Sequence, residues 1–294
     1  MGVYVYPYKM AAHLLVSGED AADFLQSQFS NDLRPLSTGE STHGLWLDVK
    51  GKIVADSWVL CEDGEQFRIF SEASPAATIR NKLEQHIIAD DVEIRPADQL
   101  EALSVIGDAA AALCAETGGE LFCLTGRRSD RPSRELIFPD SASRDEWLEG
   151  NEVVTVTNDW IQEERMKAGI ASLGCEVLPG DMPGEAGLVK EAVSLTKGCF
   201  LGQEVVARMY NVGRPQRGLY RLSGTGGAPE LPSTLSNKEG KALGELRGVV
   251  AMPSGWQGVA MLKSRFVEPG MRLCCGEATA ELTGSYGGKD VNGA

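Results

Sequence analysis

The patterning of the chain changes at residue 217, and this change limits the fold more than any other feature of the sequence. Before Arg217, segments with helical spacing alternate with strand-like segments; one helical segment carries Ala21, Leu25 and Phe29 at intervals of four residues. After Arg217 the helical spacing ends, and short strand-like segments follow one another with glycine-containing turns between them. The sequence therefore predicts an α+β region followed by a small β-barrel or sandwich.

The order of elements between residues 53 and 149 indicates a ferredoxin-like α+β layer rather than a doubly wound parallel sheet. Helices predicted at 75–86 and 108–116 are inserted among strands that fit an antiparallel arrangement. The polar loop 126–135 offers no aliphatic or aromatic side chain to a core, so its arginines are expected to be solvated.

The charge balance limits the classes of partner. The chain has 28 Lys and Arg against 42 Asp and Glu, a formal net charge of −14. This charge argues against a nonspecific nucleic-acid coat or a protein that binds anionic membranes. No apolar run reaches the roughly 18 residues that a membrane-spanning helix needs, and the first residues lack the pattern of a signal or transit peptide. We therefore expect a cytoplasmic protein without membrane contact.

The seven cysteines are scattered, and no CxxC motif occurs. The three histidines (13, 43 and 86) are far from one another and from any cysteine, so the sequence gives no support for a metal site built from local ligands. A reducing compartment is the simpler interpretation. Of the adjacent Cys274 and Cys275, strand geometry places one side chain in a core and the other at the surface.

The segment KGCFLGQEVVAR (197–208) is the most informative for function. Gly198 and Gly202 allow close approach of a ligand or of another backbone segment. Cys199 comes just before a predicted short helix, whose N-terminal end, together with Lys197, would stabilise a thiolate. The alternative is that Cys199 packs as a small apolar side chain.

The same region is locally basic. Five cations face one acidic residue, Glu204, over 197–221, a local charge of 5 − 1 = +4. The five are Lys197, Arg208, Arg214, Arg217 and Arg221. Such a patch is a candidate anion site, including a tRNA-binding surface, and the alternative is a coat of surface arginines.

The string KGCFLGQE resembles the signature of the folate-binding YgfZ proteins, relatives of the glycine cleavage T protein, an aminomethyltransferase. Further segments are similar to that family in the same order, so the resemblance spans nearly the whole chain. These segments are 14–33, 43–60, 160–170, 182–204 and 258–273.

The resemblance implies an α+β fold arranged as a three-lobed ring like that of the glycine cleavage T protein. It divides the chain into two parts of a folate-binding lobe, an inserted ferredoxin-like lobe, a C-terminal β-barrel and a flexible tail. The folate-binding lobe would comprise 1–50 and 150–215, and the inserted ferredoxin-like lobe 51–149. The barrel would comprise 216–284 and the tail 285–294.

The resemblance also implies a function. Members of the family bind tetrahydrofolate or a one-carbon-substituted folate in the central cavity, and they support assembly or repair of iron–sulfur enzymes, including those that modify tRNA. Contact with client enzymes or assembly proteins would be transient, and the chain would be a monomer. Cys199 would be the functional thiol, with Lys197 beside it.

The folate-binding positions carried over from the resemblance are Trp160, Asp56, Glu185, Gln203 and Glu204. The indole of Trp160 could stack on a flat ring of the ligand or anchor its helix in a core. Glu185 could hold the edge of the pterin or order its loop.

Two positions depart from the aminomethyltransferase pattern. Ala55 stands where one of two paired aspartates is expected, and Lys167 replaces a glutamate that would accept hydrogen bonds from the pterin. The departures favour an accessory protein over an enzyme. A folate-dependent aminomethyltransferase, methyltransferase or demethylase is the first alternative, and a tRNA-binding module is the second.

Overall fold

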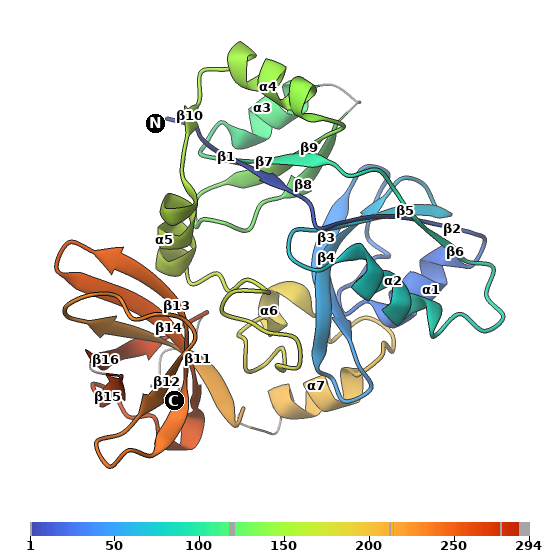
Figure 1. Cartoon of the computed structure of the whole chain (residues 1–294). Coiled ribbons are helices and arrows are strands. Elements are labelled where there is room, and N and C mark those ends of the chain that lie inside the picture. Colours follow the sequence, from blue (N-terminus) through green and yellow to red (C-terminus); the bar gives the residue numbers. More distant parts are fainter. Residues whose placement is uncertain (1, 118–120, 212, 214, 277, 288–294) are drawn as a thin grey trace.

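Three lobes surround a central region of the chain (Figure 1). The structure, a computed structural model, describes residues 2–117, 121–211, 213, 215–276 and 278–287. Two lobes are α+β and the third is a barrel, so the predicted fold class and the three-lobed arrangement are confirmed.

The first lobe is a five-stranded sheet covered on one face by two helices. Its strands, in spatial order, are β3 (Ser41–Leu47), β4 (Ile53–Cys61), β5 (Gln66–Ser71), β2 (Ala12–Ser17) and β6 (Glu93–Pro96). The helices are α1 (Ala21–Gln28) and α2 (Ala76–Glu84). Apolar side chains of both helices, including Leu25 and Ile79, pack with Trp46 and Ala55 of the sheet in one buried cluster. The other face of the sheet packs partly against the second lobe, through Trp58 and Phe70, and partly against the central region, through Leu45.

The second lobe is another five-stranded sheet with two helices. Its strands, in spatial order, are β10 (Val154–Thr155), β1 (Tyr4–Lys9), β7 (Glu101–Ile106), β9 (Ser133–Phe138) and β8 (Phe122–Thr125). Its helices are α3 (Ala110–Glu116) and α4 (Ser141–Gly150).

The third lobe is a closed six-stranded barrel. Its strands, in spatial order, are β11 (Arg217–Gly224), β14 (Gly255–Lys263), β13 (Ala242–Met252), β12 (Ser233–Ser236), β15 (Arg272–Cys275) and β16 (Ala278–Ser285). A short 3₁₀ turn, η1 (Ser264–Phe266), follows β14. Cys275 is buried and Cys274 partly exposed, as strand alternation predicts.

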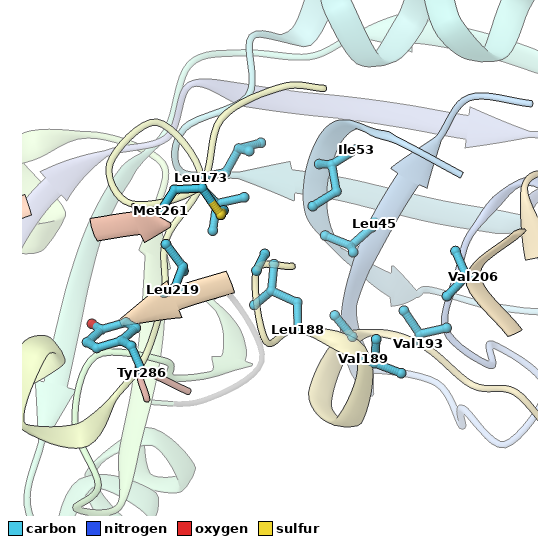
Figure 2. Close-up of a cluster of buried hydrophobic side chains, with 14 of the residues drawn as sticks. Leu45, Ile53, Leu173, Leu188, Val189, Val193, Val206, Leu219, Met261 and Tyr286 are labelled. Carbon is cyan, nitrogen blue, oxygen red and sulfur yellow. The ribbon is translucent and has the colours of Figure 1, made fainter. Parts of the chain in front are cut away.

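The central region holds three helices: α5 (Asn158–Ala168), α6 (Val189–Ala192) and α7 (Gln203–Asn211). One buried cluster joins Leu45 of the first lobe, Leu188 of the central region and Met261 of the barrel (Figure 2). Burial of this shared apolar surface ties these parts together, so a site between them has a defined geometry.

The sheets divide the chain differently from the expected boundaries. The expected boundary between residues 50 and 51 lies in the turn of the β3–β4 hairpin. The two strands of this hairpin pair with each other, from Ser41 opposite Leu60 to Leu47 opposite Ile53. The range 51–149 contributes strands to both sheets, because β1 pairs with β7, about a hundred residues further on. Pairing over such a sequence separation is decided by tertiary packing.

Two local expectations need correction. Arg128, in the loop expected to be solvated, is 3% exposed, and its guanidinium lies 4.2 Å from the ring centroid of Tyr8 and 2.8 Å from Glu72. In the expected tail, Ser285 ends β16 and the buried Tyr286 donates a 3.0 Å hydrogen bond to the Ile170 carbonyl. The rest of that tail, 288–294, lies outside the described residues.

Candidate functional site

The two faces of the β3–β4 hairpin have different roles. Side chains alternate along a strand, and residues directly opposite each other in an antiparallel pair lie on the same face. Trp46 is opposite Ala55, and both pack in the cluster under α1 and α2. Leu45 is opposite Asp56, and Leu45 belongs to the central cluster. The hairpin therefore presents Asp56, and not residue 55, to the centre of the molecule.

This alternation corrects the interpretation of Ala55. The residue is fully buried among apolar side chains, so a carboxylate there would point into the core of the first lobe. Its identity therefore does not decide whether the centre can carry out transferase chemistry. Lys167, the other departure, is exposed on α5 and pairs with Glu163 at 2.7 Å.

Asp56 is held by a set of hydrogen bonds. Its Oδ1 accepts from Ser74 Oγ at 2.9 Å and from Ser71 Oγ at 3.3 Å, and its backbone N–H donates to Ser74 Oγ at 3.0 Å. Burial opposes the charged form, but the hydrogen bond from His43, the charge of Arg127 and the bond from Ser74 lower the pKa of Asp56 below its usual value. The centre thus contains a fixed, buried carboxylate.

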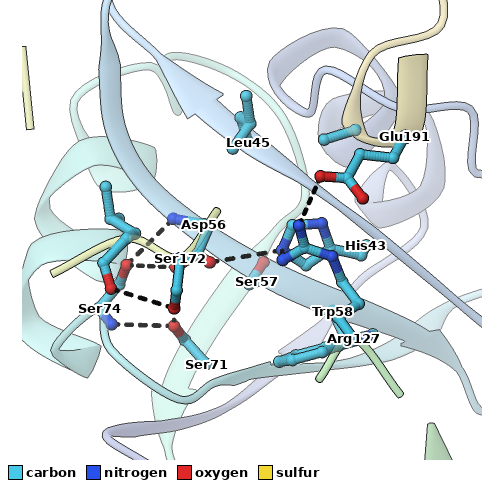
Figure 3. Close-up of polar contacts among 12 residues, drawn as sticks. His43, Leu45, Asp56, Ser57, Trp58, Ser71, Ser74, Arg127, Ser172 and Glu191 are labelled. Atoms are coloured by element: carbon cyan, nitrogen blue, oxygen red, sulfur yellow. Dashed lines mark hydrogen bonds and ion pairs between the residues drawn. The ribbon is translucent and has the colours of Figure 1, made fainter. Parts of the chain in front are cut away.

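His43, Arg127 and Glu191 complete this cluster (Figure 3). His43 Nε2 lies 3.4 Å from Asp56 Oδ2 and 3.2 Å from Arg127 Nη1, and Arg127 Nη2 donates to Glu191 Oε1 at 2.7 Å. The sequence did not predict a functional role for these three residues. A signal for His43 did exist: it is two residues before Leu45 on the same strand, so both side chains lie on the face that points to the centre. Arg127 and Glu191 come from distant segments, so no local pattern could reveal them.

A small cavity adjoins the cluster. It has a volume of about 300 Å³ and is lined by residues 168–171 at the end of α5, by residues 186–188, 190 and 191, and by Gly287. Gly169 and Gly187 form part of the wall, both with positive φ. The cluster and this cavity are the candidate site for a small polar ligand.

The loop that carries Lys197 and Cys199, called the cysteine loop below, has one exposed and one buried candidate for function. Cys199 is exposed. Lys197 is 5% exposed, and its ammonium donates to the carbonyls of Gln26, Phe29 and Asn31 at 2.6, 2.7 and 2.8 Å. Burial lowers the pKa of Lys197 to about 8. The expected pairing of this amine with the thiol is therefore corrected: Lys197 anchors the loop to the end of α1.

The cysteine loop contacts the turn of the β3–β4 hairpin, and the Asp56 cluster lies further along its strands. The turn packs against Gly202, whereas Asp56 is opposite Leu45 within the strands. Three residues separate Leu45 from Asp48, a length of roughly 10 Å at the usual rise along a strand. We therefore treat the thiol of Cys199 and the carboxylate of Asp56 as two sites.

The remaining predicted residues are dispersed. Glu185 is buried and accepts from Arg217 at 2.7 and 3.1 Å, an arrangement that orders its loop. Glu204 is on the outer surface of α7 and pairs with Arg208. Gln203 is partly buried at the first turn of the same helix.

Trp160 lines a different cleft. Its indole stacks on Tyr4 with ring centroids 5.0 Å apart. The cleft has a volume of about 890 Å³ and lies between α5 and the barrel strand β13, with Glu245 and Val250 on the far wall. Trp160 thus lines a cleft that Asp56 does not border.

The expected basic patch does not form a continuous surface. Lys197 is buried, Arg217 pairs with Glu185, and Arg221 donates to the backbone carbonyls of Met166 and Lys167. Arg208 is exposed but paired, and Arg214 lies outside the described residues. The patch therefore gives little support to a tRNA-binding surface.

Among the described residues, no three His, Cys, Asp or Glu side chains are placed to hold a metal ion. No helix in the same part of the chain is long and apolar enough to cross a membrane.

Comparison with known proteins identifies relatives over most of the chain. Residues 2–121 match the family model described as the GCVT N-terminal domain. The mitochondrial iron–sulfur cluster assembly factor IBA57 of Mus musculus is 25% identical over 290 residues, which cover 90% of this chain and 78% of the relative. The tRNA-modifying protein YgfZ of Vibrio vulnificus is 29% identical over 246 residues, 77% of this chain and 71% of the relative.

Among solved structures, the glycine cleavage system aminomethyltransferase T of Bartonella henselae has a similar fold. The TM-score is 0.78 at 19% identity, and the match covers 96% of this chain and 85% of the other. At this identity the likeness concerns the fold.

Proposed function

Because this chain belongs to the YgfZ and glycine cleavage T protein-like family, we propose that it is a tetrahydrofolate-binding accessory protein. It supports the assembly or repair of iron–sulfur enzymes, including enzymes that modify tRNA. Its ligand is tetrahydrofolate or a one-carbon-substituted form, and its contacts with clients are transient. We also propose that the protein is monomeric and cytoplasmic.

The exposure of Cys199 is the observation that carries this proposal. All seven cysteines fall within the described residues, and Cys199 alone among them is exposed. A cysteine with a purely packing role would be buried. A thiol on a loop anchored by Lys197 is accessible to a partner and held in one place, as transient transfer or capture requires.

The folate part of the proposal rests on the central cluster. A buried, ionised Asp56 accepts hydrogen bonds, and reduced folates carry N–H donors on the pterin ring. The adjoining cavity of about 300 Å³ is near the lower limit for a small-molecule site. The larger cleft beside Trp160 is the competing location.

Isothermal titration with tetrahydrofolate and with its 5-formyl derivative distinguishes the two locations. If the centre binds folate, Asp56→Asn should weaken binding at least tenfold and Trp160→Ala should leave it unchanged. The reverse result would move the ligand to the cleft beside α5. Absence of binding to the parent chain at millimolar folate would refute the folate part.

The role of the thiol is tested in cells that lack this protein. Cys199→Ser should fail to restore the activity of an iron–sulfur enzyme and the level of thiolated tRNA, whereas the matched control Cys274→Ser should restore both. Equal rescue by the two variants would exclude a functional thiol at Cys199. Thermal unfolding of both variants shows whether a loss reflects folding.

A folate-dependent aminomethyl- or methyltransferase is the second candidate, and the central carboxylate of Asp56 favours it. Chromatography would follow consumption of a one-carbon-substituted folate in the presence of an amine acceptor. Turnover that Asp56→Asn abolishes would support an enzyme, and no turnover at saturating folate would exclude it for those substrates.

A further inference from the structure

The imidazole of His43 has an unpaired nitrogen in a buried place. The residue is 7% exposed, and its Nδ1 has no hydrogen-bond partner among the described residues. Burial of a polar atom without a partner is unfavourable, so an orphaned nitrogen near a cavity is a candidate for contact with a bound molecule. The ring is held from the side by Trp58, at a centroid distance of 5.1 Å.

Two charged groups compete for the other nitrogen of the same ring. Arg127 Nη1, at 3.2 Å, can only donate, so it requires a lone pair on Nε2. Asp56 Oδ2, at 3.4 Å, can only accept while it is ionised, so it requires a proton on Nε2. The first arrangement places the ring proton on Nδ1 and the second leaves Nδ1 as an acceptor. Nδ1 can therefore offer a donor or an acceptor.

The groups that face His43 come from three elements. Asp56 lies on β4, Arg127 on the loop between β8 and β9, and Glu191 on α6. Burial first, and then the charge of Arg127, lower the pKa of His43, so the ring is neutral near pH 7. A neutral ring is the form in which the two tautomers exchange.

An ion pair lies between His43 and the nearby cavity. Arg127 and Glu191 meet at 2.7 Å, and their side chains are 14% and 41% exposed. Glu191 also borders the cavity of about 300 Å³, and Figure 3 shows the guanidinium beside the imidazole and bonded to Glu191. Separation of this pair would remove the contacts that stand between the cavity and the imidazole.

We propose that His43 is a ligand-contact residue of the central site, and that the Arg127–Glu191 ion pair is the gate through which the ligand reaches its Nδ1. The inference rests on the proposed function, because it takes a reduced folate as the ligand. A reduced pterin ring has N–H donors beside acceptor atoms, and a histidine that offers either form matches such an edge.

Nitrogen-15 NMR of the histidine side chains tests the contact. The chain has three histidines, so His43→Gln assigns the signals of His43 directly. On addition of 5-formyltetrahydrofolate to the parent chain, the Nδ1 signal of His43 should shift while those of His13 and His86 stay in place. Calorimetry on the same samples reports binding independently.

Variants test the gate. Glu191→Gln should speed association of 5-formyltetrahydrofolate several-fold in stopped-flow measurements, because a neutral amide holds Arg127 less tightly. The control Glu149→Gln removes an exposed carboxylate on α4 and should not change the rate. His43→Gln should weaken binding about tenfold or more, with folding checked by thermal unfolding.

The outcomes separate the two proposals. Calorimetric binding with unmoved His43 signals overturns the contact and leaves the proposed function standing. Equal association rates for Glu191→Gln and the parent chain overturn the gate. Absence of calorimetric binding overturns the folate part of the proposed function and, with it, the assignment of His43 as a folate contact.

Discussion

Gly202 lies directly against the turn that contains Asp48: a β-carbon added to Gly202 would be 2.6 Å from the Asp48 carbonyl oxygen. Its φ is +83°, a conformation that side chains other than glycine rarely adopt. The glycine that follows Cys199 in the signature loop thus joins the loop to the tip of the β3–β4 hairpin. The same hairpin carries His43 and Asp56 further along its strands.

Replacement of this glycine should be costly, whereas replacement of the other loop glycine should not. Gly202→Ala combines a backbone clash with an unfavourable φ and should lower the free energy of unfolding by about 2 kcal/mol or more. Gly198 has no atom within 4 Å of an added β-carbon, so Gly198→Ala should cost less than about 0.5 kcal/mol. Urea denaturation measures both, and equal costs would contradict the described contact.

Loss of the Lys197 ammonium should destabilise the protein. Lys197→Met leaves three carbonyl oxygens, two of them fully buried, without their donor, and we expect a loss on the order of 3 kcal/mol in free energy of unfolding. Lys190→Met, an exposed neighbour, is the control and should be nearly neutral. If Lys197→Met keeps full stability but changes the rate at which Cys199 reacts with a thiol reagent, the amine acts on the thiol rather than as an anchor.

Stability should depend on pH through His43. Its pKa is lowered in the folded state, so between the unfolded value of about 6.5 and the lower folded value the unfolded chain binds more protons. Stability contributed by the neutral ring is therefore present above about pH 6.5 and is lost as the pH falls towards the folded pKa. His43→Gln should reduce the slope of unfolding free energy against pH just below about pH 6.5, a window above the titration of Asp56. Chemical denaturation across this range is the measurement, and an unchanged slope would contradict a buried neutral His43.

A carboxylate at residue 55 should not create a second acidic group at the centre. Ala55→Asp places a charge in the apolar cluster beneath α1 and α2, and we expect a loss of more than about 3 kcal/mol in stability. Ala242→Asp, on an exposed strand position of the barrel, should cost little. Circular dichroism during thermal unfolding compares the two, and a stable Ala55→Asp protein with altered folate binding would place residue 55 at the centre after all.

Much of the local structure was available from the sequence. The spacing of Ala21, Leu25 and Phe29 predicted α1, and the loss of helical spacing after Arg217 predicted an all-β lobe, a small barrel or sandwich, which is a barrel in the structure. These elements depend on periodicity over neighbouring residues, which is a property of the chain itself. The string around Cys199 likewise indicated an ordered loop before a short helix.

Other features depended on contacts between distant segments. The strand order of the two sheets, the burial of Arg128 and the meeting of His43, Arg127 and Glu191 each require parts of the chain that are far apart in sequence. A polar loop and a lone histidine have no periodicity that reveals their partners, because burial and hydrogen bonding are decided when the lobes pack together. The sequence by itself therefore determined the local elements and the signature loop. Only the tertiary structure decided that Lys197 binds the carbonyls at the end of α1, that Ala55 faces a core, and that a buried histidine stands at the centre of the molecule.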